Sequence, residues 1–230
     1  MADEIVKPPA AKSSRPKQAW NEKVDGASGR RAVRESILFE TAARMFNSYG
    51  FHGTSMSQLT QELGLTKGAL YYYVEDKSDL LYKLHIKSAE ATRRAYEAGV
   101  AEGRTGYERV HGIVRHYVAA VTASPTETFI LLEKDVLNPE QTADIVNRRK
   151  QLELDLRSQI TKGIDDGSIV PCDPKLATFI LVGAMAWVSK WYEPDRDWTP
   201  DQIADAMADM LLRSIAATPS DVLIIDVAKA

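Results

Sequence analysis

The stretch TSMSQLTQELGLTKGALYYYVEDKSDLL, from Thr54 to Leu81, decides the fold of this chain. Its centre holds three consecutive tyrosines, Tyr71, Tyr72 and Tyr73. Taken alone, the segment LYYYV resembles a β-strand, because aromatic and β-branched residues are enriched in strands. The residues on either side decide between a strand and a helix.

The flanking residues favour a helix. Ser55 followed three positions later by Gln58 is the pattern of a capping box, and Gly64 is typical of a helix end. Thr66 supplies a cap oxygen for a further helix that starts at Lys67. The four-residue link GLTK between the two is the spacing of a helix-turn-helix.

The second of these helices has an inner and an outer face. At about 100° per residue, Leu70 and Val74 lie on the inner face, while Lys67, Tyr71 and Tyr72 point outward. The inner face is expected to pack on Leu59, Leu63 and Leu65. The tyrosines are therefore predicted to be surface residues of a helix.

The rest of the chain predicts an all-α protein, because apolar residues recur at helical spacing from Arg31 onward. A first helix is expected from Ala32 to Tyr49, ended by Gly50. Its inward face is predicted to hold Val33, Ile37, Leu38, Met45, Phe46 and Tyr49. A long helix capped by Asp76 follows the quoted stretch. Further helices are predicted from Thr105 to Ala123, Pro125 to Leu137, Pro139 to Asp166, Pro174 to Tyr192 and Thr199 to Ala217.

Four of the predicted starts share one signal, a capping side chain followed by proline at the first helical position. They are Ser124-Pro125, Asn138-Pro139, Asp173-Pro174 and Thr199-Pro200.

Composition indicates a soluble globular chain. Its 230 residues, 44% hydrophobic and 27% charged, suffice for one large domain or two small ones. The longest apolar runs, 179–188 and 222–225, are shorter than the roughly 20 residues of a membrane-spanning helix, so no membrane partner is expected. The N-terminus lacks an apolar signal segment, and the single cysteine, Cys172, favours a reducing cytoplasm.

Charge is distributed unevenly within a net charge of -3. The first 34 residues carry 8 basic and 4 acidic side chains together with prolines, glycines and serines. Such a segment buries too little apolar area to offset its ordering entropy, so residues 1–30 are predicted to be a disordered basic arm. Contact with a polyanion and simple solvation both fit this arm.

The chemistry of an enzyme is missing from the sequence. The 4 histidines are scattered, and His111 and His116 stand about 140° apart on a helix, whereas a metal pair needs i, i+4 spacing. Acidic pairs such as Asp165-Asp166 sit at predicted helix ends, where solvated charge is the ordinary role. Neither an enzyme nor a cofactor is predicted.

The segment from about Arg31 to Ala91 resembles the N-terminal domain of TetR-family transcriptional regulators. The likeness rests on RRAVRESILFETAARMFNSYGFHGTSM followed by LTQELGLTKGALYYYVEDKSDLL. It implies a helix-turn-helix DNA-binding domain of three helices at 31–91, with the motif at about 54–73. It also implies a larger helical domain for ligand binding and dimerisation at 92–218, followed by a tail at 219–230.

The resemblance implies contacts with double-stranded DNA. Lys67 is expected to reach a guanine edge or a phosphate, Gly68 to allow close approach, and Lys77 to hold a phosphate. The full set implied is Thr54, Ser55, Ser57, Lys67, Gly68, Tyr71, Tyr72, Tyr73 and Lys77, with Gln58 as a lesser candidate. Simple capping by Ser55, solvation of Lys67 and packing of Tyr73 are the alternatives.

The resemblance also implies a homodimer and a small-molecule effector, and several features of the second half fit both. Small residues at 177, 183, 184 and 186, continued at 204, 206 and 208, would let helices approach closely. Predicted ligand contacts are Phe129, Ile130, Leu132, Arg148, Ile160, Phe179, Trp187 and Trp191, with Arg149 and Lys150 as further contacts for phosphates. Packing of the tryptophans and solvation of the basic run are the alternatives.

The pattern AWVSKWYEPDRDWTPDQIADAMADMLL resembles the branch of this family that senses acyl-CoA thioesters in lipid or steroid catabolism. The expected function is that of a repressor that binds a palindromic operator as a dimer and is released by a lipophilic effector. Two alternatives remain open: a multidrug-responsive repressor of efflux genes, and a helical ligand-binding protein that does not bind DNA.

Overall fold

The computed structural model describes residues 27–124, 136–193 and 198–217, and within this part the chain is built almost wholly of helices. The helices are α2 (Ala27–Gly53), α3 (Met56–Leu63), α4 (Lys67–Tyr71), α5 (Lys77–Glu102), α6 (Gly106–Ala123), α7 (Pro139–Asp165), α8 (Pro174–Trp191) and α9 (Pro200–Arg213). An isolated antiparallel bridge joins Ile169 to Ala216. The predicted all-α fold class is confirmed.

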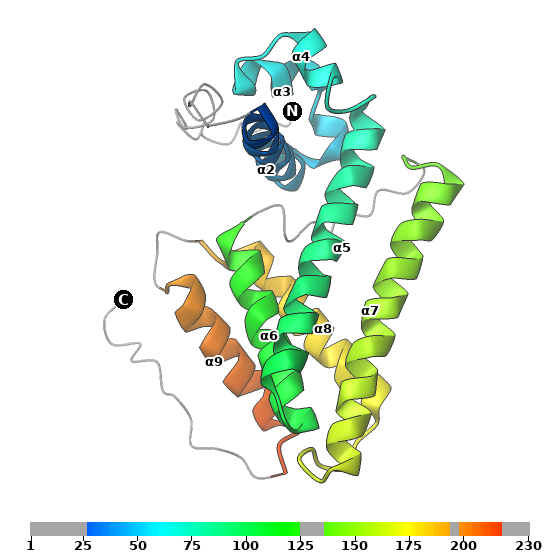
Figure 1. Cartoon of the computed structure of the whole chain (residues 1–230), viewed down its shortest axis with the longest axis vertical. Coiled ribbons are helices and arrows are strands. Elements are labelled where there is room, and N and C mark those ends of the chain that lie inside the picture. Colours follow the sequence, from blue (N-terminus) through cyan, green and yellow to red (C-terminus); the bar gives the residue numbers. More distant parts are fainter. Residues whose placement is uncertain (1–26, 125–135, 194–197, 218–230) are drawn as a thin grey trace, which may run out of the picture.

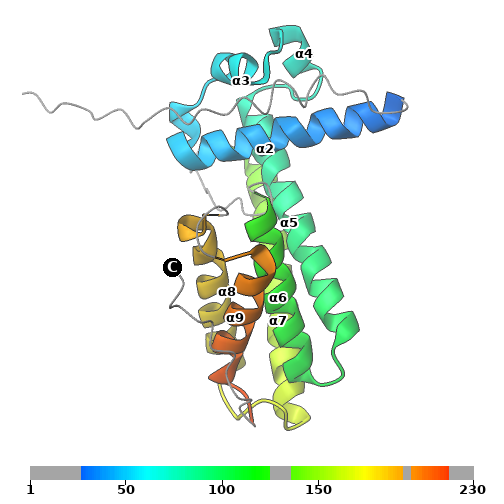
Figure 2. The ribbon, with the colours of Figure 1, turned by 90° about the vertical axis from the view of Figure 1, so that its left-hand side faces the viewer.

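The helices form a small headpiece on top of a longitudinal bundle (Figure 1). Helices α2, α3 and α4 lie at one end, and α5 runs from this headpiece along the bundle formed with α6 to α9. In the turned view, α2 lies crosswise over the end of the bundle (Figure 2). Helix α5 is thus the main covalent and packing link between the two parts.

Each part has its own hydrophobic core. The headpiece core is centred on α2 residues such as Phe39 and Phe46, and it includes Leu80, Leu81 and Leu84 from the first turns of α5. The bundle core draws on α6 to α9, with Tyr96 and Val100 of α5 packed against it. The two ends of α5 therefore belong to different cores.

Most predicted helix ends are confirmed. Thr105, Asn138, Asp173 and Thr199 each cap the helix that follows them. Helix α2 begins before the predicted Ala32 and continues beyond Gly50, but Gly50 has a φ of 73° and breaks the helix there, as a stop residue does.

Two expectations differ from the structure, and three others concern segments that lie outside the described residues. Tyr49 was expected to face inward but is 56% exposed, because the buried face of α2 runs through Phe39, Ala42 and Phe46. The alanines of α9 were expected to let helices approach closely at a dimer interface, but they are buried within the subunit, and Ala204 and Ala208 belong to its bundle core. The arm before residue 27, the helix expected at 125–137 apart from its last two residues, and the tail from residue 218 lie outside the described residues.

Glycine contacts bring three bundle helices unusually close. A Cβ atom added to Gly99 of α5 would lie 2.2 Å from the backbone nitrogen of Ile113 in α6. A Cβ atom on Gly106 of α6 would lie 2.2 Å from Gly163 in α7. The backbones of α5, α6 and α7 are therefore in direct contact at these crossings.

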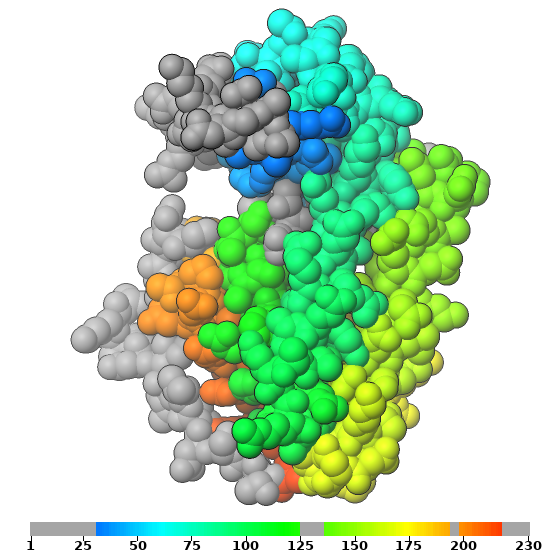
Figure 3. All heavy atoms as spheres, viewed as in Figure 1, coloured from blue at the N-terminus to red at the C-terminus, as the bar shows by residue number. Residues whose placement is uncertain are grey.

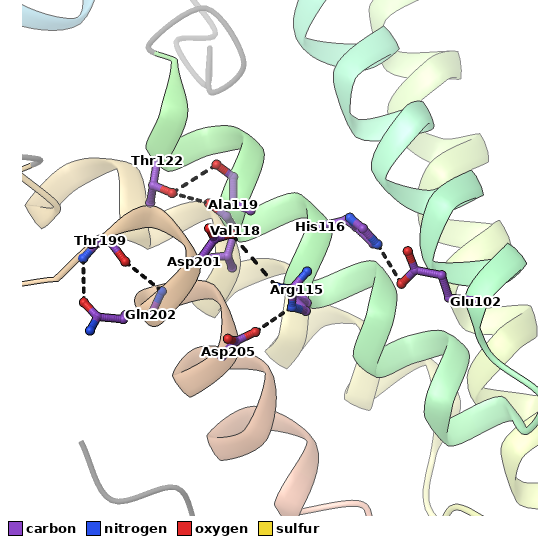
Figure 4. A network of polar contacts seen from close by, with 10 residues as sticks. All are labelled: Glu102, Arg115, His116, Val118, Ala119, Thr122, Thr199, Asp201, Gln202 and Asp205. Carbon is purple, nitrogen blue, oxygen red and sulfur yellow. Dashed lines mark hydrogen bonds and ion pairs between the residues drawn. The ribbon is translucent and has the colours of Figure 1, made fainter. Parts of the chain in front are cut away.

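Ion pairs tie α6 to its neighbours at the bundle surface (Figure 4). The guanidinium of Arg115 lies 2.5 Å from the Asp205 carboxylate of α9, and the His116 ring lies 2.9 Å from Glu102 of α5. His111 pairs instead with Asp209 at 2.8 Å. The prediction that His111 and His116 do not share a face is confirmed, since they bind carboxylates on different helices.

Candidate DNA-binding surface and effector cavity

The helix-turn-helix is built from local capping contacts. The Ser55 hydroxyl accepts a hydrogen bond from the Gln58 backbone at 3.2 Å, and the Gln58 side chain accepts one from the Ser55 backbone at 2.7 Å. Gly64 ends α3 with a φ of 68°, and Thr66 caps α4 through the Ala69 N–H. The predicted turn is confirmed at each of these positions.

Helix α4 presents a polar and aromatic outer face. Leu70 and the following Val74 are buried, which fixes the rotation of the helix as predicted. Tyr71 is 47% and Tyr72 is 65% exposed. A Cβ atom on Gly68 would meet nothing within 4 Å, so nothing inside the subunit requires glycine there. Glycine at such a position leaves room for another surface to approach the helix backbone closely.

Tyr73 lies beneath this outer face. It is half-buried and packs against the headpiece core, with its ring 5.1 Å from that of Tyr72 in an edge-on arrangement. The guanidinium of Arg31 lies 5.4 Å from the centre of the Tyr72 ring, a contact that was not predicted from the sequence. Tyr73 thus packs between the headpiece core and the Tyr72 ring, which agrees with packing as the alternative to DNA contact.

Lys77 and Thr54 are engaged inside the headpiece. The Lys77 ammonium donates hydrogen bonds to the carbonyl oxygens of Phe51 at 2.8 Å and Thr54 at 2.9 Å. The Thr54 side chain is 1% exposed, and its hydroxyl donates to the Gly50 carbonyl at 3.0 Å. Thr54 was expected to contact a phosphate at the surface, but its side chain is buried. Its hydroxyl instead donates to a carbonyl group that has no helical donor because α2 is broken at Gly50.

A second lysine holds the end of α4 in place. The Lys83 ammonium donates to the Tyr73 carbonyl at 2.9 Å and to the Asp79 carboxylate at 2.8 Å. Asp79 also accepts from the Glu75 backbone at 2.9 Å. The loop between α4 and α5 is thereby fixed to the first turns of α5.

Of the residues proposed for DNA contact, six are exposed at the same end of the molecule (Figure 1). They are Ser55, Ser57, Lys67, Gly68, Tyr71 and Tyr72. We call this set the recognition surface. Thr54, Tyr73 and Lys77 lie below it as supports.

A separate cavity of about 270 Å³ lies within the bundle, between α5, α6, α7 and α8. Most of its walls are apolar, with Ile113, Ile145, Leu156 and Met185 among them. Polar groups enter from three helices: His85, Ser88, Thr92 and Tyr96 of α5, Tyr117 of α6, and Arg149 and Glu153 of α7. An apolar pocket with a few converging polar groups is the usual form of a small-molecule site.

Matches to protein-family models follow the same division of the chain. Residues 38–84 match the family described as "Bacterial regulatory proteins, tetR family", and residues 103–215 match "Tetracyclin repressor-like, C-terminal domain".

A solved structure of AibR "in complex with isovaleryl coenzyme A and operator DNA" is 31% identical to this chain. The match has a TM-score of 0.67 and covers 78% of this chain and 98% of AibR. The chain belongs to the TetR family of transcriptional regulators.

More distant members of the TetR family include the "HTH-type transcriptional repressor KstR2" of Rhodococcus jostii (strain RHA1). It is 23% identical over 197 residues, which cover 84% of this chain and 96% of KstR2. The structure of KstR2 from Mycobacterium tuberculosis shares the fold, with a TM-score of 0.70 at 19% identity over 84% of this chain and 97% of KstR2. This TetR-family chain is thus a DNA-binding regulator.

The ligand contacts predicted for this TetR-family chain are dispersed in the structure. Phe179, Trp187 and Trp191 lie on the exposed face of α8, and Ile160 is fully buried in the bundle core. Arg148 lies outside the cavity and binds Asp144 at 3.0 Å. Phe129, Ile130 and Leu132 lie outside the described residues. Among the predicted residues that the structure describes, Arg149 alone lines the cavity.

A basic groove adjoins the cavity on the outer side of α5 and α7, which lie next to each other in Figure 3. It is lined by Arg93 and Arg94 of α5 and Arg148 of α7, with Glu90 at its edge. Ala89 and Leu152 line both spaces, so the groove and the cavity are neighbours. The sequence did not indicate this arrangement, because its residues come from helices about 60 residues apart.

Proposed function

We propose that this TetR-family protein is a repressor that binds a palindromic operator as a homodimer and is released by a small lipophilic effector of the acyl-CoA type. The observation that carries this proposal is the position of α5. Its first turns form part of the headpiece core, and its later turns line the cavity. A molecule in the cavity therefore touches the helix whose first turns pack in the core of the headpiece.

The recognition surface supports the DNA-binding step. Lys67 stands at the N-terminus of α4, where its charge and the free backbone N–H groups both favour phosphate or a guanine edge. Tyr71 and Tyr72 offer rings to sugar, phosphate and thymine methyl groups beside the open position of Gly68. Ser55 and Ser57 add hydroxyls on the neighbouring helix.

The outer face of α8 supports the homodimer. An apolar patch of this kind on a monomer marks an interaction site. Its exposed residues are Leu176, Phe179, Ile180, Trp187 and Trp191, and Met210 of α9 is exposed as well. A two-fold dimer would present two recognition surfaces to the two halves of a palindrome.

The cavity and the basic groove together support an acyl-CoA as the effector. The cavity fits an acyl chain, and the groove offers guanidinium groups to the phosphates of coenzyme A. Its arginines already bind acids, Arg93 with Asp155 at 2.6 Å and Arg148 with Asp144 at 3.0 Å, so phosphates would compete with these pairs. AibR, a relative, was solved with isovaleryl coenzyme A and operator DNA.

Release of the protein from its operator is explained by a shift between two geometries of the dimer. Tyr82 of α5 donates a hydrogen bond to Asp144 of α7 at 2.8 Å, close to the headpiece. An effector that separates α5 from α7 favours a geometry in which the recognition surfaces no longer match successive grooves, so operator affinity falls.

The proposal places the protein in the cytoplasm and assigns it no enzymatic activity and no cofactor. Within the described residues, no helix has the length and apolarity to cross a membrane, and no three His, Cys, Asp or Glu side chains gather as a metal site. The proposed boundaries are 31–91 for DNA binding and 92–218 for ligand binding and dimerisation.

The deciding experiment compares thermal stabilisation by isovaleryl-CoA, octanoyl-CoA, octanoate and a cationic drug such as ethidium. The proposal expects a rise in Tm with at least one CoA ester, and release of bound DNA by the same ester. Stabilisation by ethidium alone would favour the multidrug-responsive alternative. No effect of any CoA ester would exclude the acyl-CoA assignment.

A further inference from the structure

Arg149 brings a positive charge to the wall of the cavity. Its guanidinium donates a hydrogen bond to Nδ1 of His85 at 3.3 Å, and both side chains line the cavity. Arginine can only donate, so Nδ1 of His85 accepts and its ring proton sits on Nε2. His85 in this state carries no charge that could balance Arg149.

The acidic and phenolic groups near Arg149 do not balance the charge either. Glu153, one turn along α7, is bound by Arg157, and Asp144 is bound by Tyr82 and Arg148. Burial raises the pKa of Tyr117 to about 12, so the phenol in the cavity wall stays neutral at pH 7. Arg149 forms no ion pair with a carboxylate from the part of the chain that the structure describes.

Burial lowers the pKa of Arg149, which is the response of a cation that is poorly solvated and poorly compensated. Arginine nevertheless keeps its proton at neutral pH. A partly buried charge without a counter-ion is unfavourable, and an anionic ligand relieves that cost on binding.

We propose that Arg149 binds an anionic oxygen of the effector inside the cavity, and that this ligand group replaces His85 as the partner of the guanidinium. The proposal rests on the proposed function and deepens it, because it names the polar group that the effector must carry. A carboxylate and a phosphate share this chemistry. The apolar remainder of the ligand lies against Ile113, Leu156 and Met185.

His85 connects the binding of an anion at Arg149 to the DNA-binding headpiece. It follows Leu84, which is fully buried in the headpiece core. When the anionic group of the ligand replaces His85 as the partner of Arg149, the hydrogen bond that joins α7 to this point of α5 is lost. The loss weakens the connection between α5 and α7 next to the headpiece, so Arg149 both recognises the anion and transmits its binding.

The test uses three probes with one acyl chain: octanoate, octanoyl-CoA and 1-octanol. The inference expects octanoate or octanoyl-CoA to raise the Tm of the wild type more than 1-octanol does. Preference for octanoate identifies a carboxylate as the anion that the site takes, and preference for octanoyl-CoA identifies a phosphate. Loss of that preference in Arg149→Gln assigns the anion to Arg149 and not to the arginines of the groove. Equal or greater stabilisation by 1-octanol overturns the inference.

The variant Arg149→Gln keeps hydrogen-bonding groups but removes the charge. Its affinity for the preferred anionic probe, measured by titration calorimetry, should fall roughly tenfold to a hundredfold, with binding of 1-octanol unchanged. Lys162→Gln removes an exposed charge on the same helix and should bind like the wild type. Unchanged binding of the anionic probes by Arg149→Gln overturns the inference.

Two further outcomes are decisive. A wild type that binds DNA but is stabilised by none of the three probes overturns this inference while leaving the DNA-binding proposal intact. Should Arg149→Gln fail to fold, the comparison of the three probes on the wild type still decides, and Arg149→Lys, which keeps the charge, should retain the preference for the anion.

Discussion

The side-chain ammonium of Lys77 lies 2.8 Å from the carbonyl oxygen of Phe51 and 4.1 Å from the centre of the Phe51 ring. The lysine thus joins the first residue of α5 to the irregular end of α2. Its ammonium group donates hydrogen bonds to two carbonyl groups that lack a helical N–H partner, because α2 ends irregularly there. Its position next to the recognition surface is a consequence of this bracing role.

Replacing Lys77 by methionine should therefore destabilise the protein. The Thr54 carbonyl loses the lysine donor, and the Phe51 carbonyl keeps only the Thr54 N–H at 3.3 Å, which together costs about 1–3 kcal/mol. Urea unfolding measures the difference. The matched variant Lys67→Met removes an exposed lysine from α4 and should change the free energy of unfolding by no more than about 0.5 kcal/mol. Equal stability of both variants would show that Lys77 does not brace the headpiece.

The α8 surface gives a prediction about assembly. The double variant Phe179→Glu, Trp187→Glu puts two charges on the exposed apolar face, and it should convert a dimer into monomers because a buried, unpaired charge opposes association. Light scattering coupled to size-exclusion chromatography measures the mass. Leu154→Glu, at an exposed apolar position of α7, serves as control and should leave the mass unchanged. A dimeric double variant would place the interface elsewhere.

Asp166 should make the stability depend on acid pH. Hydrogen bonds from Ser168 and from the Gly106 backbone lower its pKa below the usual 3.8. A carboxyl with a lowered folded pKa contributes stability above its unfolded pKa and loses that contribution as the pH falls through the folded value.

The Tm of the wild type should therefore fall more steeply below about pH 4 than that of Asp166→Asn. Thermal unfolding between pH 2.5 and 6 measures this difference. Parallel curves for the two proteins would contradict the assigned role of Asp166.

The parts of the fold that could be predicted are those that depend on neighbours in sequence. The capping box of Ser55 and Gln58 and the proline starts of α7, α8 and α9 are local, so their signals are complete within a few residues. Leu70 and Val74 likewise fix the rotation of α4 through helical periodicity alone.

The parts that could not be predicted depend on contacts between distant helices. An apolar side chain fits a core, a cavity or a dimer face equally well, so Ile160, Phe179 and Trp187 gave no basis for choosing among these roles. The pairing of Arg149 with His85 joins residues 64 positions apart. The hydrogen bond from Lys77 to the Phe51 carbonyl depends on the direction that the backbone takes after the break at Gly50, and the sequence does not specify that direction.

The central claim is that the exposed side chains of α4 read DNA. The most direct measurement is fluorescence anisotropy with a palindromic duplex that the wild type selects from a random pool, repeated at several salt concentrations. The double variant Lys67→Ala, Tyr72→Ala should keep its far-UV circular dichroism and Tm but lose specific binding, while Lys162→Ala binds as tightly as the wild type. Affinity of the wild type should fall steeply with added salt. Tight, salt-insensitive binding by the folded double variant would contradict the account.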